Sequence, residues 1–305
     1  MSNIGVVLVT YNRISMLKKT LLAFDKQSEL PQYILVIDNA STDGTDEFLN
    51  KWIEDKRTYY KKFFRTSENI GGSGGFYTGL KIVTEHYSEF NAKWIYVSDD
   101  DAFPEYNCIE NACKYTNDLS VPAICAEVLN QNTIDSSHRR IISTNYLQVN
   151  EEYVPASQYA HPFYVNSFSF VGVFLNIEYI RRIGLPEKNY FIWYDDTEYS
   201  YRLCKDNYAI VCPDIIVHHD VSYYNTLTWK DYYGTRNKGL MIKKNFSFRY
   251  YFFYCCFTIL KSFMRIVLKK NPKKIPLEIS GIVDSILNRQ GIHKIYRPGW
   301  KSSSK

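Results

Sequence analysis

The 305-residue sequence lacks the features that mark several common classes of protein. It has no run of 18 apolar residues, so we expect no membrane-spanning helix. It has no internal repeat, and its 45% hydrophobic and 23% charged residues exclude a disordered or collagen-like chain. The first 13 residues carry no basic segment ahead of their apolar run, so we do not expect a signal peptide.

Common catalytic and redox motifs are also missing. The seven cysteines are an odd number and form no CxxC pair, so we expect buried, reduced thiols in a cytoplasmic protein. No GxSxG, HExxH or Cys/His zinc pattern occurs, which excludes the usual hydrolase templates.

The net charge of +5 hides an uneven distribution. Residues 230–305 hold 17 Lys and Arg against three acidic residues, whereas residues 1–229 hold 20 basic and 29 acidic residues. Such asymmetry suggests that a membrane surface, a nucleic acid or a polyanionic substrate is the partner of the tail. We therefore divide the chain into an acidic body, residues 1–229, and a basic tail, residues 230–305.

The first part of the body alternates between apolar strands and amphipathic helices. Strands are expected at 4–9, 33–37 and 94–97. Helices are expected after Asn12, which can cap the first of them, after the turn at 41–44, and around Phe76–Val83. This alternation predicts an α/β fold with a mainly parallel sheet and flanking helices.

The second part of the body, residues 102–229, is less regular. Residues 119–165 are polar and expected to be rich in loops, and an apolar segment follows at 168–175. Short apolar runs at 210–211 and 215–217 flank Pro213 and lead to His218 and His219.

Polar residues follow three of the expected strands. Ligands bind beyond the carboxyl ends of the strands in open α/β sheets, so these residues should surround one crevice. They are Thr10–Asn12, Asp38–Asn39 and Ser98–Asp101.

The three consecutive aspartates, Asp99–Asp101, suggest a cation site. Adjacent carboxylates repel one another after a buried strand unless a cation neutralises them. Asp99 and Asp101 point the same way in an extended segment, and paired carboxylates suit Mg²⁺ or Mn²⁺ bridging to a diphosphate. A solvated acidic turn is the alternative.

A glycine-rich segment with Gly71, Gly72, Gly74 and Gly75 opens the helix around Phe76. Backbone amides at a helix N-terminus suit a phosphate, and glycine permits close approach of a ligand. The segment matches neither the P-loop nor the dinucleotide fingerprint, so a flexible loop remains an equal alternative.

Asp195 and Asp196 follow the aromatic segment 191–194. A carboxylate in an apolar cleft can act as a general base toward a hydroxyl, although an acidic helix N-terminus is a serious alternative. Glu198 and Arg202 are spaced to form a helical ion pair. One histidine of His218 and His219 could complete a metal site, but a lone histidine is more often structural.

The order of these motifs resembles that of the family 2 inverting glycosyltransferases with the GT-A fold. The motifs are VTYNR, VIDNASTDGT, NIGGSGGF, VSDDDAFPE, FIWYDDTEYSYR and PDIIVHHD, and they cover roughly residues 4–245. Within the family, the chain looks most like bacterial galactofuranosyltransferases and the related rhamnosyltransferases. The resemblance implies a GT-A catalytic domain over 1–229, with a nucleotide-sugar half, 1–101, and an acceptor half, 102–229.

The resemblance also implies a role for each matching residue. The donor-binding residues would be Thr10, Asn12, Asp38, Asn69, Gly71, Gly72, Gly74, Gly75, Asp99 and Asp100. Asp99 and Asp101 would bind Mn²⁺ or Mg²⁺ together with His219, or with His218 as the alternative. Asp196, beside Asp195, would be the general base, while Trp193, Tyr194 and Trp229 would stack on acceptor sugars.

The basic tail, residues 230–305, is expected to be helical. Its aromatic segment 250–260 is too short to cross a bilayer and is followed by dense Lys and Arg, as in interfacial anchors. A helix packed on the catalytic domain is the alternative. With the resemblance, this favours an enzyme on the cytoplasmic face of the cell membrane that uses a polyprenyl-diphosphate-linked acceptor in surface polysaccharide synthesis.

Two other functions are compatible with parts of the sequence. A nucleic-acid-binding or scaffold protein would use the basic tail, but the acidic body argues against it and we expect no nucleic-acid partner. A nucleotidyltransferase would need a basic loop for a triphosphate, which the N-terminal half lacks. For the donor, UDP-galactofuranose is the first expectation and dTDP-rhamnose the second.

Overall fold

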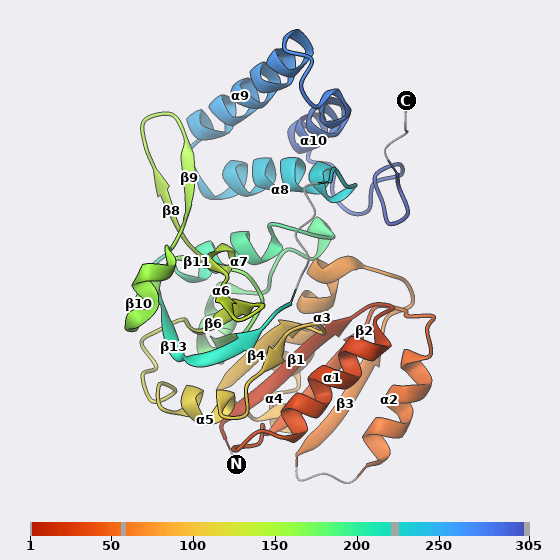
Figure 1. Ribbon diagram of the computed structural model, residues 1–305, viewed down its shortest axis with the longest axis vertical. Coiled ribbons are helices and arrows are strands. Elements are labelled where there is room, and N and C mark those ends of the chain that lie inside the picture. Colours follow the sequence, from red (N-terminus) through yellow and green to blue (C-terminus); the bar gives the residue numbers. More distant parts are fainter. Residues whose placement is uncertain (1, 56–58, 221–225, 302–305) are drawn as a thin grey trace.

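A computed structural model describes residues 2–55, 59–220 and 226–301 of the chain (Figure 1). In this described part, ten strands form one mixed sheet with the order β10-β13-β6-β12-β4-β1-β2-β3, in which β5 pairs with β13 and β7 with β6. The strands of this sheet are β1 (Ile4–Thr10), β2 (Tyr33–Asp38), β3 (Tyr60–Arg65), β4 (Trp94–Asp99), β5 (Phe103–Pro104), β6 (Ala123–Asn130), β7 (Thr133–Ile134), β10 (Phe163–Val165), β12 (Val173–Asn176) and β13 (Ala209–His218).

A smaller sheet and the helices complete the fold. The smaller sheet consists of β8 (Arg139–Thr144), β9 (Val149–Tyr153) and β11 (Ser167–Phe168). The α-helices are α1 (Ile14–Asp25), α2 (Thr45–Glu54), α3 (Gly71–Glu85), α4 (Tyr87–Phe90), α5 (Cys108–Cys113), α6 (Ile177–Ile183), α7 (Asp195–Leu203), α8 (Lys230–Asn245), α9 (Phe248–Val267) and α10 (Ile275–Ile286). Short 3₁₀ turns lie at η1 (Ser136–His138), η2 (Ala156–Ala160), η3 (Lys188–Tyr190) and η4 (Pro272–Lys274).

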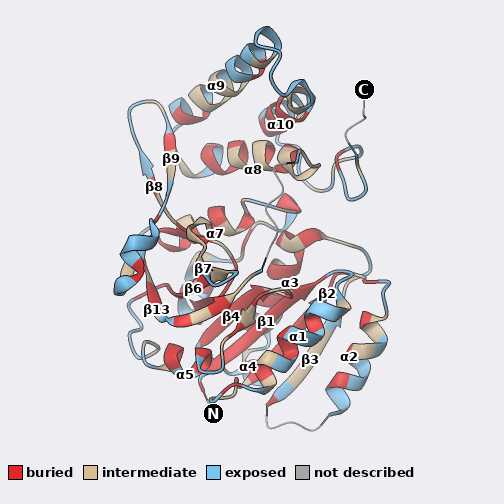
Figure 2. Cartoon of the chain, viewed as in Figure 1, coloured by how far each residue is buried: buried red, intermediate tan, exposed pale blue. Residues whose placement is uncertain are grey.

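The N-terminal half confirms the expected α/β unit. Strands β3, β2, β1 and β4 are parallel neighbours, and every residue of β1 is buried because helices cover both faces (Figure 2). Val7 and Val9 of β1 belong to the core beneath α3, while Val6 and Leu8 pack with α1 and α2 on the other face. Alternation of side chains along a strand explains this division.

The predicted cap of α1 is wrong. The side chain of Asn12 makes no cap, because its Oδ1 accepts a hydrogen bond from the backbone N–H of Thr42, at 2.7 Å. Asp43 takes the capping role, since its Oδ2 accepts a hydrogen bond from the N–H of Ile14, at 2.9 Å. The cap therefore comes from a loop 29 residues away in the sequence, beyond the reach of local patterns.

The second half of the body departs from the prediction in two ways. Strand β12 lies antiparallel between β4 and β6, so the sheet is mixed and its parallel part is confined to two regions. Residues 119–165, expected to be rich in loops, contain β6 to β10. They are polar because β8 and β9 form a hairpin that projects from the body toward the C-terminal helices, with many side chains exposed (Figure 1).

The tail folds into the stacked helices α8, α9 and α10 at one end of the molecule (Figure 1). Helix α9 is longer than the aromatic segment that predicted it and reaches about 30 Å. In the parts of the chain that the structure describes, no helix combines the length and apolar character needed to cross a membrane. The seven cysteines are free, and Cys256 on α9 is exposed rather than buried as expected.

Candidate active site

A cleft of about 570 Å³ opens at the carboxyl ends of β1 and β4. The β-sheet register explains why the predicted residues meet there: Thr10 lies opposite Asp38 of β2, and Val9 lies opposite Asp99 of β4. The predicted site residues that line the cleft are Thr10, Asn69, Gly71, Gly72, Asp99, Asp101, Trp193, Asp195, Asp196, His219 and Trp229.

Asp100 lies behind the cleft and holds its floor together. Its buried carboxylate accepts a hydrogen bond from the hydroxyl of Thr10, at 2.5 Å, and pairs with the Arg13 guanidinium, at 2.6 Å. Burial raises the pKa of Asp100 to about 7, even though Arg13 and Thr10 oppose the shift. Arg13 also pairs with Asp101, so one guanidinium bridges two of the three consecutive aspartates.

The other two aspartates face the cleft. Burial, followed by repulsion from Asp101, raises the pKa of Asp99 to about 6. Burial alone would also raise the pKa of Asp101, but His219 and Arg13 outweigh it and lower the pKa. Asp99 thus lies in a region that a further positive charge would stabilise.

The structure separates the two histidines. His219 Nε2 lies 3.4 Å from Asp101 Oδ1 and the residue lines the cleft. His218 belongs to β13 and its Nε2 lies 2.9 Å from Glu105 Oε1, so it is engaged outside the cleft. Of the two alternatives, His219 is the one that faces the aspartates.

The side chains of Asp99, Asp101 and His219 are chemically suited to bind a hard divalent cation, but they are not yet close enough together to do so. Two carboxylates and an imidazole are ligands that Mn²⁺ or Mg²⁺ accepts, and His219 Nδ1 is buried with no hydrogen-bond partner among the described residues. Within residues 2–55, 59–220 and 226–301, however, no three His, Cys, Asp or Glu side chains are gathered as a ready metal site. The residues Asp99, Asp101 and His219 therefore fit the chemistry of a cation, but binding requires their side chains to converge.

Asn12 and Asp38 shape the loops beside the cleft instead of lining it. Asp38 is fully buried, accepts a hydrogen bond from the N–H of Ser41, at 3.0 Å, and pairs with Arg65, at 3.0 Å. Asn12 adopts a left-handed backbone conformation, with φ +51°, and binds the N–H of Thr42. Both side chains thus join the end of a strand to the loop before α2.

The glycine-rich segment is the first turn of α3 and serves two purposes. Gly71 and Gly72 line the cleft. The N–H of Gly71 donates to Oδ1 of Asn69, at 2.9 Å, and the N–H of Ser73 donates to the carbonyl oxygen of Phe191, at 3.3 Å, so these two amides are already engaged within the protein. Gly74 and Gly75 are buried and do not line the cleft. A Cβ on Gly75 would lie 2.5 Å from Val9 Cγ1, so glycine is required there for α3 to approach β1.

Gly71 also connects the cleft to the segment that carries Asp195 and Asp196. A Cβ on Gly71, whose φ is +74°, would lie 2.0 Å from the carbonyl oxygen of Phe191. Phe191, Trp193 and Tyr194 themselves have φ between +62° and +69°. Such a run of strained backbone persists only where surrounding contacts impose it, and it is typical of functional sites.

Asp195 and Asp196 occupy the first turn of α7, and their environments differ. Burial and the neighbouring Asp196 raise the pKa of Asp195 well above its usual value. Asp196 is partly exposed; its Oδ1 accepts a hydrogen bond from the N–H of Thr197, at 2.6 Å, and its Oδ2 lies 4.0 Å from Arg140 Nη2. Asp196 is therefore the more accessible carboxylate of the two, and Asp195 is the one whose environment favours its protonated form.

The segment 190–194, which we call the strained segment, is held in place by hydrogen bonds from the C-terminal helices. Asn237 Nδ2 of α8 lies 2.9 Å from the carbonyl oxygens of Tyr190, Ile192 and Trp193. The adjacent Arg236, also buried, donates to Tyr190 O at 2.9 Å and to Gly291 O at 2.7 Å. The tail is thus part of the support of the site and not an appendage.

Sequence reasoning missed several residues of the site. Arg13, Lys230 and Pro298 also line the cleft, and Arg140 lies beside Asp196. Burial lowers the pKa of Lys230, although Asp99 opposes the shift. The Arg of the YNR motif was a visible signal, whereas Lys230, Arg140 and Pro298 are distant in sequence and carry no local pattern.

The predicted aromatic residues divide between two spaces. Trp193 lines the cleft and also a neighbouring cavity, while Tyr194 lines that neighbouring cavity and not the cleft. Trp229 lies in the cleft and packs near Phe191, with ring centroids 6.0 Å apart. Trp229 therefore lies in the same cleft as Asp99 and Asp196.

A model of the family described as Glycosyl transferase family 2 matches residues 5–178, more than half of the chain. The chain belongs to this family. The expected enzyme class, a glycosyltransferase, is thereby confirmed. The galactofuranosyltransferase GlfT1 of Mycobacterium tuberculosis is 24% identical over 216 residues, covering 67% of this chain and 65% of the relative. The abequosyltransferase RfbV of Salmonella typhimurium is 31% identical over 99 residues, or 32% of this chain and 28% of the relative.

Solved structures share the fold at low sequence identity. The S. aureus TarS fragment 1–349 in complex with UDP-GlcNAc has a TM-score of 0.59 and 16% identity, covering 94% of this chain and 81% of that chain. The mannosyltransferase PcManGT of Pyrobaculum calidifontis, in complex with GDP-Man and Mn²⁺, has a TM-score of 0.57 and 17% identity, covering 93% and 75%. The mixed sheet with helices on both faces is accordingly a GT-A fold, as expected.

Proposed function

We propose that the chain is a metal-dependent, inverting glycosyltransferase that moves galactofuranose from UDP-galactofuranose to a carbohydrate acceptor. One observation carries this proposal: a single cleft is lined by Asp99 and Asp101 on one element and by Asp196 on another. The first pair suits the diphosphate end of a nucleotide sugar through a cation, and Asp196 suits an acceptor hydroxyl. The similarity to galactofuranosyltransferases supports the choice of donor.

In this proposal the donor lies along the carboxyl ends of β1, β2 and β4. Thr10 and Asn69 contact the nucleotide, and Asn12 and Asp38 order the loops around the nucleoside. Gly72 presents its amide to the diphosphate from the first turn of α3, while Gly71, whose N–H donates to Asn69, lines the same side of the cleft. Gly74 and Gly75 contribute by bringing α3 close to β1, and Asp100 by holding Thr10 and Arg13 in place beside the donor sugar.

The chemical step is a single displacement at the anomeric carbon. Asp196 accepts the proton of the acceptor hydroxyl while that oxygen attacks, and the nucleoside diphosphate leaves from the opposite face, so the configuration inverts. Mn²⁺ or Mg²⁺ held by Asp99, Asp101 and His219 would supply positive charge for the leaving diphosphate. Lys230 and Arg13 add positive charge to the same cleft.

We assign the C-terminal helices a role at the cytoplasmic face of the cell membrane, where a polyprenyl-diphosphate-linked acceptor would be available. Helix α9 exposes large apolar side chains, among them Phe263 and Ile266, each 59% exposed. Lys261, Lys269 and Lys270 flank them. An exposed apolar face next to dense positive charge favours the interface of an anionic bilayer.

Nucleotide release from a panel of sugar donors tests the function. The purified full chain is incubated with UDP-galactofuranose, UDP-galactopyranose, UDP-GlcNAc and dTDP-rhamnose, with Mn²⁺, Mg²⁺ or EDTA. We expect UDP release to be fastest with UDP-galactofuranose and to be lost in EDTA. Faster nucleotide release from dTDP-rhamnose would identify dTDP-rhamnose as the donor in place of UDP-galactofuranose. Full activity in EDTA would show that the reaction needs no metal ion. No turnover of any donor would contradict the proposed function.

A further inference from the structure

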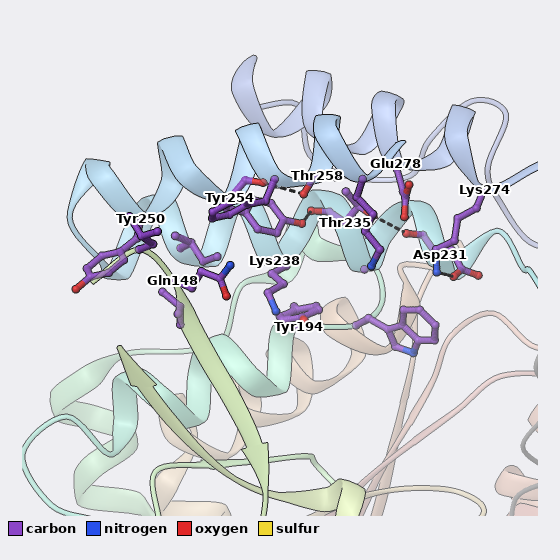
Figure 3. A pocket seen from close by; sticks show the side chains of 17 residues that line it. Gln148, Tyr194, Asp231, Thr235, Lys238, Tyr250, Tyr254, Thr258, Lys274 and Glu278 are labelled. Atoms are coloured by element: carbon purple, nitrogen blue, oxygen red, sulfur yellow. Dashed lines mark hydrogen bonds and ion pairs between the residues drawn. The ribbon is translucent and has the colours of Figure 1, made fainter. Parts of the chain in front are cut away.

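A second cavity, of about 550 Å³, lies between the β8–β9 hairpin and the helices α8, α9 and α10 (Figure 3). We call it the hairpin groove; it is bounded by Leu147–Val149 of the hairpin and by the facing sides of the three helices. Its volume falls within the range of about 300–1,000 Å³ that is usual for ligand pockets. We call the cleft of about 570 Å³ that contains Asp99 and Asp101 the donor cleft; neither its aspartates nor the glycines of α3 line the hairpin groove.

The hairpin groove meets the donor cleft next to the proposed base. Trp193 lines both spaces, and Tyr194 lines the groove with its side chain while its backbone leads directly into Asp195 and Asp196. An acceptor with one hydroxyl at Asp196 therefore has its remaining sugar rings directed toward the groove.

A chain of side chains also connects the groove to Asp196. Lys238 lines the groove and pairs with Glu151, with Nζ 2.8 Å from Oε1, and the hydroxyl of Tyr194 donates to the same oxygen at 3.2 Å. Glu151 Oε2 lies 3.7 Å from Arg140, whose other nitrogen lies 4.0 Å from Asp196. Figure 3 shows Lys238 and Tyr194 together on the side of the groove that faces the body.

The lining of the groove suits an uncharged ligand. Most of its charged side chains are paired: Lys274 with Asp231 at 3.0 Å, Lys238 with Glu151, and Glu278 with Arg265 at 3.3 Å; Lys261 also lines it. The neighbouring cavity of about 1,280 Å³ shares Asp231 and Lys274 with the groove but is the more basic of the two. It adds Arg13, Lys19, Lys230 and Lys273 against Asp101 and Asp220. A diphosphate would be drawn to the basic cavity, whereas paired charges leave the groove without a strong preference for either sign.

Aromatic rings and hydrogen-bonding side chains both line the groove. Tyr250, Tyr254 and Phe257 of α9 contribute rings, and Gln148 and Thr235 contribute polar atoms. A sugar ring has apolar C–H faces and a polar rim of hydroxyls, so it matches this mixed lining better than a purely apolar chain does. We propose that the hairpin groove binds neutral sugar residues of the acceptor glycan and thereby sets which acceptor the enzyme uses, an inference that rests on the proposed function.

Filling the groove tests whether it binds glycans. Saturation-transfer NMR is recorded with neutral di- and tetrasaccharides of glucose, galactose, rhamnose and N-acetylglucosamine, and with uronic-acid analogues of the same length. We expect signals from at least one neutral oligosaccharide, lost in Thr258→Trp, since Thr258 lines the groove. Cys256→Trp adds the same bulk to an exposed position of α9 and should keep them. UDP affinity reports correct folding of both variants.

A second experiment removes one polar side chain from the groove and measures the KM for the acceptor. Gln148 is exposed and lines the groove, so Gln148→Ala removes a contact at little cost to folding. We expect the KM for an accepted oligosaccharide to rise about three- to tenfold. Gln158→Ala, also at an exposed position but outside the groove, should leave the KM unchanged.

The outcomes separate the groove from the proposed function. Neutral oligosaccharides that fail to bind, that bind equally well to Thr258→Trp, or that bind more weakly than their anionic analogues would overturn the groove assignment. If the wild-type enzyme then still releases UDP from UDP-galactofuranose, the proposed function stands and only the acceptor site is wrong. Absence of UDP release instead counts against the function itself.

Discussion

At the residue scale, the two neighbouring carboxylates of α7 have opposite properties. Asp195 is buried and its pKa is raised well above its usual value, whereas Asp196 is partly exposed and lies near Arg140. Both residues line the cleft, but Asp195 is 6% exposed whereas the Asp196 side chain is 24% exposed. In the proposed mechanism, the more accessible Asp196 is the residue that accepts the proton of the acceptor hydroxyl.

Asp196→Asn should reduce transfer about 10²- to 10⁴-fold, because the amide cannot accept the proton of the acceptor. Donor affinity should change little, since the proposed donor site involves the strands across the cleft. Initial rates of glycosyl transfer and calorimetry with UDP measure the two quantities. Asp206→Asn, at an exposed position after α7, is the control and should behave as wild type; an active Asp196→Asn enzyme would refute the base assignment.

Glu198 forms the ion pair with Arg202 that its spacing predicted, with Arg202 Nε 3.0 Å from Oε1. Burial alone would raise the pKa of Glu198, but Arg202 and Lys244 outweigh burial and lower it. A folded-state pKa below that of the unfolded chain gives stability that is present above the unfolded pKa of about 4.3 and is lost as the pH falls through the folded value.

Glu198→Gln should therefore lower the free energy of unfolding at pH 7 by about 2–4 kcal/mol, because it leaves Arg202 without its partner. The difference from wild type should shrink as the pH falls from 5 to 3. Urea denaturation at a series of pH values measures it. Glu178→Gln removes a partner of Arg181 at the surface and should cost about 0.5 kcal/mol or less; equal losses in both variants would contradict the role of burial.

At the scale of elements, α3 approaches β1 more closely than a helix with side chains would permit. Gly75 and Gly79 both face β1, and a Cβ on Gly79 would lie 2.4 Å from Val7 Cγ1. The glycine pattern that suggested a phosphate loop thus has two causes. Gly71 and Gly72 serve the cleft, and Gly75 and Gly79 serve packing.

Gly75→Ala should destabilise the protein by about 1–3 kcal/mol, since Val9 on a buried strand has little room to move. Gly72→Ala is the matched control: nothing lies within 4 Å of its Cβ position, so its stability should stay the same or rise by up to about 1 kcal/mol. Urea denaturation compares the two variants. A stable Gly75→Ala protein would show that α3 can shift away from the sheet.

Asn237 of helix α8 connects the tail to the strained segment, residues 190–194. Asn237→Ala removes the side-chain donor of the Ile192 and Trp193 carbonyls and leaves the Tyr190 carbonyl with its bond from Arg236, so we expect a loss of about 2–3 kcal/mol in the free energy of unfolding. Transfer should also slow, because Asp196 follows directly after this segment and small displacements of a base are costly. Asn50→Ala on α2 is the control, and its stability should change by about 0.5 kcal/mol or less. Normal stability and a normal kcat in Asn237→Ala would show that α8 does not support the site.

At the scale of the whole molecule, the C-terminal helices have two different sides. One side of α8 supports the active site and, with α9 and α10, bounds the hairpin groove. The outer side of α9 is apolar and exposed (Figure 2). The two alternatives considered for the tail, a membrane anchor and a helix packed on the catalytic domain, are therefore compatible, because different faces would serve each role.

The full chain should co-sediment with vesicles of phosphatidylcholine and phosphatidylglycerol, and binding should weaken as salt is added. Replacing both Phe263 and Ile266 by Ser should reduce partitioning about tenfold or more, since two apolar side chains no longer enter the interface. Leu22 and Ile53, exposed on the body, provide the control double Ser variant. Equal binding of the two double variants would contradict the role of α9.

The α/β core and the order of the motifs around the cleft could be predicted from the amino-acid sequence alone. Buried strands such as 4–9 have a periodicity that follows from local burial, and the carboxyl ends of parallel strands must meet at one edge. The family, the clustering of Thr10 with Asp99 and Asp101, and the Glu198–Arg202 pair could be predicted for this reason. All of these features depend on spacing along the chain or on a general rule of sheet topology.

Features that depend on contacts between distant segments could be assigned only from the folded structure. It favoured His219 over His218, assigned the cap of α1 to Asp43, and separated the glycines that face the cleft from those that pack on β1. It also showed that Asn237, 41 residues beyond Asp196, donates hydrogen bonds to the strained segment that precedes Asp195 and Asp196. Side-chain directions and long-range hydrogen bonds arise from the packing of the whole chain, so no local pattern in the sequence records them.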